Sequence, residues 1–328
     1  MSNFAVGLLN VAIVATAPLL LAALGELISQ RGGVINLGIE GVMLIGALTG
    51  FVTAGVTGNP WLGLFVAIIC GMLFSAIHAF MCVSLGADQV ISGVMLSILG
   101  LGLTTYLGSD WVGRSARTLE ASGLPIIGGI LDSLPVVGQS IFVQAPTTFL
   151  AFLLAPLVWL FLYRTNLGLE IVAVGEDPET ADAAGINVKS RRYIAVLLGG
   201  ALAGAAGAHL SLAQAQLWAT DMVGGRGFVA IALVIFVQWS PIRAVFGSLL
   251  FGIIDAFVIR SQSVDFSGML FGWNETIQTS FSWVFNPTVM PMYPYIITIV
   301  ALTVISIYSS RENLGAPAAL LENYTRTE

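Results

Sequence analysis

The chain begins with MSNFAVGLLNVAIVATAPLLLAALGELI (residues 1–28), a run that decides the class of fold. Glu26 is the only charged side chain in this run. A helix that crosses the hydrocarbon core of a bilayer needs about 20 predominantly apolar residues, and this run supplies them. The run lacks the positively charged start and the small-residue cleavage site of a secretory signal peptide. We therefore predict a first membrane-spanning helix over 6–28 that is kept in the mature protein.

The rest of the chain has the same apolar character. Hydrophobic residues make up 57% of the 328 residues, charged residues make up 9%, and the mean hydropathy is +0.92. Soluble domains usually contain about 25% charged residues. The alternating ten-residue segments of a membrane β-barrel are missing. We predict an all-α, polytopic integral membrane protein with about nine transmembrane helices, in the range 8–10, some of them short or broken.

Apolar runs give the approximate positions of these helices. The predicted spans are 6–28, 34–56, 61–85, 90–108, 147–164, 193–216, 227–239, 244–260 and 291–309. The sequence QWSPIR separates two short spans, and Pro241 within it cannot continue a helix without losing a hydrogen bond. We expect a tight helical hairpin or a pair of half-helices there, covered by protein or by a water-filled cavity. Residues 1–310 are predicted to form a single transmembrane domain, and 311–328 a short tail.

Lys and Arg in short loops predict the orientation in the membrane. The segment 165–192 and its flank carry Arg164, Lys189, Arg191 and Arg192, which predicts a cytoplasmic position. By alternation, the N-terminus and the loops 109–146 and 261–290 are then outside, and the tail is cytoplasmic. Arg114, Arg117 and Arg260 do not follow this pattern.

Several classes of function are not supported by the sequence. It contains no Walker-type phosphate loop, no metalloprotease His-Glu-x-x-His and no Gly-x-Ser-x-Gly motif, so we expect a protein that is not an enzyme and binds no cofactor itself. The sequence contains no basic patch of the kind that would indicate a nucleic-acid partner. Cys70 and Cys82 lie in one apolar run, where they are expected to be small buried side chains. His78 and His209 are solitary, and the pattern favours hydrogen-bonded core residues.

The segment RTNLGLEIVAVGEDPETADAAGINVKSRRY, residues 164–193, contains the signals of a short helix. Asp177 is a good N-cap, Pro178 fits the first helical position, and Glu179 places negative charge at the positive end of the helix dipole. Gly185 supplies the C-terminal stop, and small residues such as Ala181 and Ala184 make a helix over 178–184 thin. Such a helix is either an ordinary connecting turn or a helix that docks in a groove of a cytoplasmic partner.

This loop resembles the coupling helix of ATP-binding-cassette (ABC) importers. The chain as a whole resembles the permease family that serves branched-chain amino acids, simple sugars and nucleosides, and is most similar to its nucleoside branch. The resemblance extends over about residues 20–260, in the blocks RGGVINLGIEGVMLIGA (31–47), ADQVISGVMLSILGLGLTTYL (87–107), NLGLEIVAVGEDPETADAAGINV (166–188), LGGALAGAAGA (198–208) and GGRGFVAIALVIFVQWSPIRAVFGSLLFGIIDA (224–256). Two positions differ from the usual family pattern, Val172 in place of Arg and Ser97 in place of Asn.

The resemblance implies a function and a set of partners. The chain would be a permease subunit in a bacterial cytoplasmic (inner) membrane, paired with an identical or different second permease. Separate ATPase subunits would bind ATP and Mg²⁺ and contact the chain through Asp177, Pro178, Glu179, Ala181, Ala184 and Gly185. An external solute-binding protein would deliver a small polar solute, with a nucleoside expected first. Branched-chain amino acids or simple sugars are alternatives. A self-sufficient ion-coupled carrier or channel, with Glu40 and Asp255 as ion sites, is an alternative from another class.

Polar residues inside apolar spans are candidates for the translocation path. Asn36 and Glu40 are four residues apart and would share a helix face over the predicted span 34–56. Arg226 opens a span after Gly-Gly, where the amides of a helix start bind anions or polar groups. Ser92 and Ser97 complete the candidate set. The alternative is that these groups hold helices together by hydrogen bonds, with Glu40 either protonated or paired to Arg226. Gly33, Gly41 and Gly46 are expected to allow close helix approach.

Overall fold

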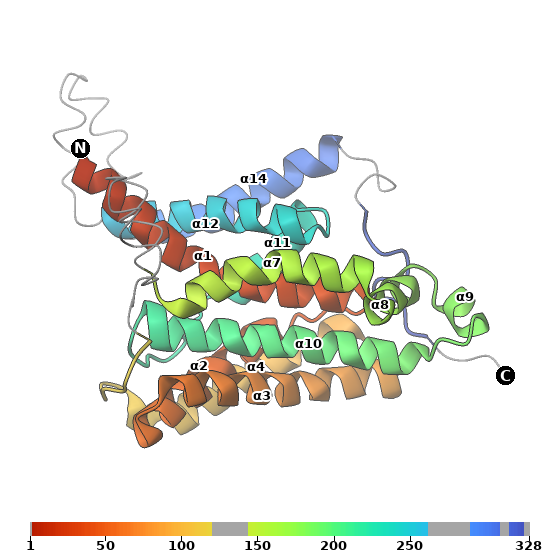
Figure 1. Cartoon of the computed structure of the whole chain (residues 1–328), viewed down its shortest axis with the longest axis horizontal. Helices are drawn as coiled ribbons and strands as arrows, with labels where there is room; N and C mark the ends of the chain where they lie inside the picture. Colours follow the sequence, from red (N-terminus) through yellow and green to blue (C-terminus); the bar gives the residue numbers. More distant parts are fainter. Residues whose placement is uncertain (1, 120–143, 262–288, 309–314, 325–328) are drawn as a thin grey trace.

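In the computed structural model, residues 2–119, 144–261, 289–308 and 315–324 are described. Helices are the only regular secondary structure over these ranges, which confirms the predicted all-α class. They are α1 (Ser2–Arg31), α2 (Ile39–Thr57), α3 (Pro60–Ala79), η1 (Phe80–Ser84), α4 (Gln89–Gly108), η2 (Ser109–Trp111), α7 (Pro146–Arg164), α8 (Asn166–Glu176), α9 (Pro178–Ala183), α10 (Val188–His209), η3 (Leu210–Gln214), α11 (Arg226–Phe236), α12 (Pro241–Ser261), η6 (Met290–Met292) and α14 (Tyr293–Tyr308). The long helices run side by side, with the N-terminus at one end of the bundle and α9 at the other (Figure 1).

A helix lies within each of the predicted spans, but the number of full spans is smaller than predicted. Seven helices of the described ranges are long and apolar enough to cross a membrane: α1, α2, α3 with η1, α4 with η2, α7, α10 with η3, and α12. Helix α11 has 11 residues, a length of about 16 Å, and α14 has 16 residues. Over the described residues the count of full-length spans therefore differs from the predicted nine. In the case of α11, the apolar run 227–239 continues past Phe236, where the helix ends.

The break predicted at QWSPIR is confirmed. Helix α11 ends at Phe236 and α12 begins at Pro241. Between them, Gln238 and Trp239 adopt left-handed backbone conformations with φ of 54° and 52°. Trp239 is buried, and its indole Nε1 donates a hydrogen bond of 2.7 Å to Gln30 Oε1 on α1. The half-helix α11 is thus tied at its end to the interior of the bundle.

Helix α10 lies in the core, packed by α1, α2 and α3. Glycines make this packing close. A Cβ atom at Gly25 would lie 2.6 Å from the Gly199 carbonyl oxygen, and one at Gly46 would lie 2.6 Å from Gly204 Cα. A membrane provides little hydrophobic force between helices, so backbone-to-backbone packing of this kind supplies the dispersion contacts that hold them together. The predicted role of Gly46 in close helix approach is confirmed.

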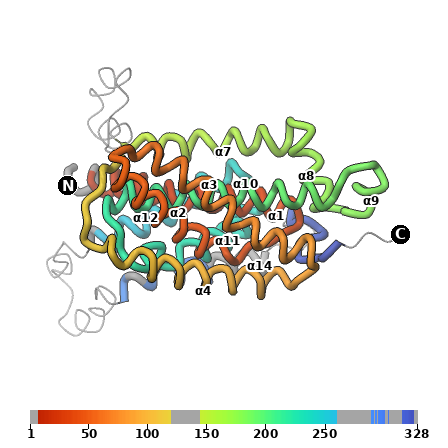
Figure 2. Tube along the Cα trace, turned by 90° about the horizontal axis from the view of Figure 1, so that it is seen from below, coloured from red at the N-terminus to blue at the C-terminus, as the bar shows by residue number. Residues whose placement is uncertain are grey.

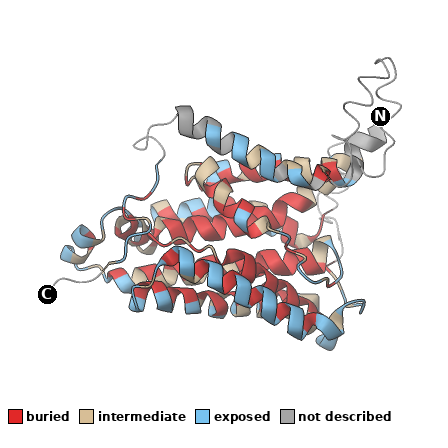
Figure 3. Ribbon diagram, turned by 180° about the vertical axis from the view of Figure 1, so that it is seen from behind, coloured by how far each residue is buried: buried red, intermediate tan, exposed pale blue. Residues whose placement is uncertain are grey.

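The outer helices present apolar side chains to the surroundings of the chain. Of the 18-residue apolar stretch of α1, 83% is buried, whereas 28% of the corresponding stretch of α4 is buried. Helices α4 and α7 lie on opposite sides of the bundle (Figure 2). Buried residues fill the middle of the molecule, and exposed residues follow the outer helices (Figure 3). This distribution suits a protein whose outer surface contacts lipid or further membrane subunits.

Short capping motifs set the boundaries of several helices. Gly58 ends α2 in the left-handed conformation, and the next residue, Asn59, accepts hydrogen bonds from Trp61 N at 3.0 Å and Leu62 N at 3.3 Å. This turn makes α2 and α3 an antiparallel pair. The predicted loops 109–146 and 261–290 lie mostly outside the described residues.

Candidate transport site and coupling surface

The segment 32–38 is a non-helical link between α1 and α2, in contrast to the helix predicted from residue 34. Glu26 Oε1, on α1, accepts a hydrogen bond of 2.9 Å from Asn36 N. Asn36 Oδ1 in turn accepts one of 2.9 Å from Gly38 N. An asparagine that bonds its neighbouring backbone competes with helix formation, which explains why α2 begins only at Ile39. The prediction that Asn36 and Glu40 share a helix face is therefore wrong.

Side chains of α3 and α4 hold this link in place. Gln89 Oε1 accepts from Ile35 N at 2.9 Å, and His78 Nε2 donates to Ile35 O at 2.9 Å. The Ser97 hydroxyl donates to Leu37 O at 2.8 Å. The Ser92 hydroxyl lies 3.1 Å from His78 Nδ1, so Ser92 supports the link through the histidine. His78 is thus a hydrogen-bonded core residue, as predicted. Asn36, Ser92 and Ser97 all stabilise the link, and their contact with a solute stays a prediction.

Glu40 binds the start of the half-helix α11. Its Oε1 accepts a hydrogen bond of 2.7 Å from Gly225 N, and its Oε2 accepts one of 2.6 Å from Gly227 N. Glu40 is 6% exposed. The unpaired N–H groups and the dipole of a helix N-terminus make a binding site for an anion, and here the carboxylate of Glu40 occupies it. α2 and α11 are joined by this interaction, although they are 185 residues apart.

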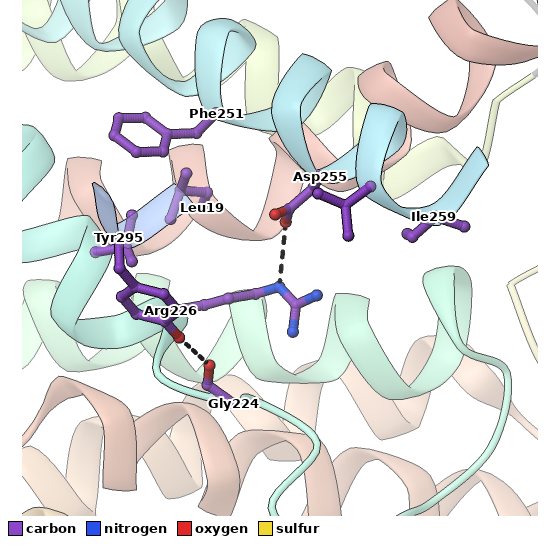
Figure 4. Close-up of a pocket in the computed structure, with 9 residues that line it drawn as sticks. Leu19, Gly224, Arg226, Phe251, Asp255, Ile259 and Tyr295 are labelled. Atoms are coloured by element: carbon purple, nitrogen blue, oxygen red, sulfur yellow. Dashed lines mark hydrogen bonds and ion pairs between the residues drawn. The ribbon is translucent and has the colours of Figure 1, made fainter. Parts of the chain in front are cut away.

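Arg226 forms an ion pair with Asp255 of α12. The predicted ion pair between Glu40 and Arg226 is not observed among the described residues. The Arg226 Nε lies 3.7 Å from Asp255 Oδ2. The Arg226 Nη1 also donates to the Val223 carbonyl at 3.0 Å. The Tyr295 hydroxyl, on α14, donates to Gly224 O at 2.6 Å (Figure 4).

These polar groups line a cavity of about 250 Å³. The lining residues come from α1, from the start of α11, from α12 and from α14: Leu19, Gly224, Arg226, Val229, Phe251, Asp255, Val258, Ile259 and Tyr295. Figure 4 shows the Arg226 side chain reaching the Asp255 carboxylate, and the Tyr295 hydroxyl directed at the Gly224 carbonyl oxygen. Of the predicted path residues, only Arg226 lines this cavity, whereas Asn36, Glu40, Ser92 and Ser97 lie around the link. Tyr295 was not predicted, since no sequence signal distinguishes it from other aromatic residues near a helix start.

The short helix predicted over 178–184 is confirmed as α9. The Asp177 side chain caps it by accepting from Thr180 Oγ1 at 2.5 Å and from Thr180 N at 3.0 Å. Hydrogen bonds from Thr180 hold the pKa of Asp177 below its ordinary value. The cap is therefore intact at neutral pH and is lost only as the pH falls through this lowered pKa. Gly185 ends the helix with φ of 85°.

The surface of α9 fits a docking role. Ala181 is buried against Val174 of α8 and Val188 of α10, and this apolar contact fixes α9 on the bundle. Glu179, Ala184 and Gly185 are exposed. A Cβ atom at Gly185 would find no other atom of the described chain within 4 Å. A thin, capped and exposed helix is thus held firmly on the end of the bundle, and its contact with an ATPase subunit stays a prediction.

Helix α8 lies within the predicted loop 165–192 and connects α9 to the link. Arg31 Nη1 forms an ion pair of 3.5 Å with Glu176 Oε1 at the end of α8. Arg31 Nη2 also donates to Trp239 O at 3.1 Å, after α11. A Cβ atom at Gly175 would lie 3.1 Å from Gly33 N, so the two backbones touch. A continuous set of contacts therefore runs from α9 through α8 and the link to both ends of α11.

A helical membrane bundle with a half-helix beside a polar cavity, and with a capped helix on a loop at one end, has the features of a transport permease. The chain belongs to the family described as "Branched-chain amino acid transport system / permease component", which matches residues 7–274. It is an ABC transporter permease of the sugar and nucleoside type. Permease subunits of this family are components of transport systems.

Relatives resemble the chain over nearly its whole length. The putative glucose ABC transporter permease TsgC13 of Haloferax volcanii is 53% identical, over 99% of this chain and 99% of its own. The guanosine ABC transporter permease NupQ of Bacillus subtilis is 36% identical, and the nucleoside ABC transporter permease NupC of Lactococcus lactis is 34% identical. These two cover 89% and 88% of this chain and 89% of their own. The same organisms each have a second, more distant relative, at 27%, 26% and 25% identity. No solved structure matches the chain.

Proposed function

We propose that this chain is a permease subunit of an ABC importer in the cytoplasmic membrane, and that its cargo is a small, uncharged, hydroxylated solute. A simple sugar is the first candidate. The observation that carries this choice is the 53% identity to a putative glucose permease over 99% of both chains. The nucleoside expected from the sequence blocks is the second candidate, supported by relatives at 36% and 34% identity.

The charges inside the bundle argue against an ion-coupled carrier. Both oxygens of Glu40 accept backbone hydrogen bonds at the start of α11, and Asp255 faces Arg226. An ion site needs carboxylates that are free to exchange protons or cations. These two already have partners, so energy for transport is better supplied by ATPase subunits that bind ATP and Mg²⁺.

The partners in this proposal are two ATPase subunits, a second permease and an external solute-binding protein. Relatives occur as one closer and one more distant chain in each of three organisms, which supports an unlike pair of permeases. The loop that contains α9, and the tail, would be cytoplasmic, and the N-terminus outside, as the distribution of Lys and Arg favours.

The contacts of α9 suggest how closure of the ATPases would change access. Movement of α9 would reach Gly175 and Glu176 at the end of α8, and through them Arg31 and Gly33. The link would then shift the start of α2, and Glu40 would carry that shift to the start of α11 beside the cavity. A packed element moves as a unit rather than deforming continuously, so small shifts at α9 can switch the half-helix.

Uptake by the reconstituted complex tests the cargo. We would co-reconstitute this chain, its partner permease and the ATPase subunits in vesicles, add the binding protein, and measure ATP-dependent uptake of labelled glucose and labelled guanosine. Glucose uptake that excess guanosine does not compete with supports the sugar. Guanosine uptake alone establishes the second candidate. Uptake driven by an ion gradient with this chain alone would contradict the proposed function.

A further inference from the structure

Residues 315–324, which we name the C-terminal strap, lie along the same end of the bundle as α8 and α9 (Figure 1). The sequence predicts only a short tail here. The backbone N–H of Ala319 donates to Gly175 O, at the end of α8, over 3.0 Å. Ala318 N donates to Glu176 Oε2 over 3.3 Å, and Ala319 is 3% exposed. The strap is thus packed onto the junction between α8 and α9.

Tyr324 connects the strap to α9 itself. Its side chain packs against the small apolar cluster of Val174, Ala181 and Val188, one residue from each of α8, α9 and α10. The Tyr324 hydroxyl donates to Asp182 Oδ2 of α9 over 3.0 Å. Because α9 has only 6 residues, its position depends on such contacts rather than on its own helical stability.

The strap also covers a buried arginine of α10. Arg192 is 2% exposed, and its Nη1 donates to Glu322 O over 2.7 Å. Its Nε and Nη2 have no acceptor among the described residues. Without the strap this buried guanidinium would lose its acceptor, which is costly for a charged group. A Cβ atom at Gly33 would lie 3.2 Å from Arg192 Nη2 and 3.3 Å from Ala319 O, so the strap and the arginine both border the link.

A fourth contact connects the strap to the segment between η1 and α4. Asn323 Nδ2 donates to Gly86 O over 2.7 Å, in the connection between η1 and α4. The strap therefore joins α9, the start of α10, the link and the base of α4, whose Ser97 also holds the link.

We propose that the C-terminal strap positions α9 and transmits its movement to α10 and α4, so that uptake stays coupled to ATP hydrolysis. This inference rests on the proposed docking of α9 on the ATPase. The strap and the start of α9 border one surface hollow of about 360 Å³, lined by Glu176, Asp177, Pro178, Glu179, Ala318, Ala319, Glu322, Asn323 and Tyr324. An ATPase subunit seated on the start of α9 would therefore contact the strap as well.

The test compares three variants in the full reconstituted complex. One removes residues 315–328, one combines Asn323→Ala with Tyr324→Phe, and a control carries Tyr106→Phe, whose residue is 79% exposed on α4. Co-purification of the ATPase subunits, ATP hydrolysis and solute uptake are measured for each. We expect the truncation to lower solute transported per ATP by at least about fivefold, the lower end of typical coupling between sites. The double substitution should lower it by about threefold, because it removes the side-chain hydrogen bonds to Gly86, Ala87 and Asp182 and leaves the backbone in place. The control should match the wild type.

The outcomes separate this inference from the proposed function. If the wild-type complex transports solute with ATP and both strap variants keep the wild-type ratio of uptake to hydrolysis, the strap inference is wrong and the proposed function stands. If the truncated chain fails to assemble, the double substitution decides. If the wild-type complex shows no ATP-dependent uptake, the proposed function itself fails.

Discussion

At the scale of single residues, Glu40 holds the start of the half-helix α11. A carboxylate that accepts from two backbone N–H groups at a helix start serves as a cap, although it comes from a different helix. It also places a negative charge where the helix dipole is positive. The position of α11 beside the cavity is therefore fixed in part by a contact between residues 185 apart in sequence, together with the Arg226–Asp255 ion pair and the Trp239–Gln30 hydrogen bond.

Replacing Glu40 by Gln should destabilise the protein and impair uptake. The amide offers one acceptor instead of two and turns a donor toward an N–H group. We expect a loss of about 2 kcal/mol in the free energy of unfolding, as for a lost cap or charged hydrogen bond. Thermal unfolding in detergent and uptake in vesicles measure the two effects. The exposed carboxylate of Glu179 gives the matched control for stability, and Glu179→Gln should unfold as the wild type does. Equal unfolding of the two variants would contradict the capping role.

Sequence patterns predicted which polar residues lie inside the bundle, but not their partners. Glu40 and Arg226 were both identified, yet Arg226 pairs with Asp255, because register between distant helices is set by tertiary packing. For Asn36 the pattern gave the wrong local structure. Four-residue spacing indicates a shared face only if the segment is helical, and the hydrogen bond from Gly38 N to the Asn36 side chain prevents that. Glu26 stood out as the only charged side chain of residues 1–28, but the sequence did not predict its hydrogen bond with Asn36 N, and Tyr295 carried no signal at all.

At the scale of helices, apolar periodicity located each element more reliably than it located its end. The run 227–239 predicts a span, but the backbone leaves the helix at Phe236. Local capping signals were more informative. Asp177, Pro178 and Gly185 predicted α9 to within one residue, since caps depend on neighbouring atoms alone. Helix α8 was missed because its amphipathic sequence is short and follows Arg164 without an obvious break.

Glycines on these helices differ in the space available for a side chain. Comparing a crowded glycine with an uncrowded one therefore tests the close packing of the helices. Gly46 faces Gly204 Cα, whereas nothing lies within 4 Å of a Cβ atom at Gly102 on α4. Gly46→Ala should destabilise the bundle by about 2 kcal/mol, the usual cost of overpacking. Gly102→Ala should leave stability unchanged or raise it by up to about 1 kcal/mol through helix propensity. Unfolding in detergent measures both, and equal stability of the two variants would contradict the close packing of α2 on α10.

At the scale of the whole molecule, the fold places the two candidate sites, the exposed helix α9 and the cavity, on one continuous path of contacts. The exposed α9 is at one end of the bundle, and the cavity beside Arg226 lies inside it. The link 32–38 lies between them and is held by α1, α3, α4 and α8. This arrangement suits a subunit that receives movement at its surface and opens or closes a path within.

The measurement that tests the role of α9 most directly is uptake and ATP hydrolysis by the reconstituted complex with Gly185 replaced. Gly185→Ala adds only the strain of an alanine in the left-handed conformation, about 1–2 kcal/mol. Its added Cβ atom would contact no other described residue of this chain. Gly185→Trp adds the same strain and a large side chain on the exposed surface. We predict that the Ala variant keeps most solute-stimulated ATPase activity and uptake. The Trp variant should hydrolyse ATP without transporting solute. Wild-type uptake and solute-stimulated hydrolysis in the Trp variant would contradict the docking of α9 on the ATPase.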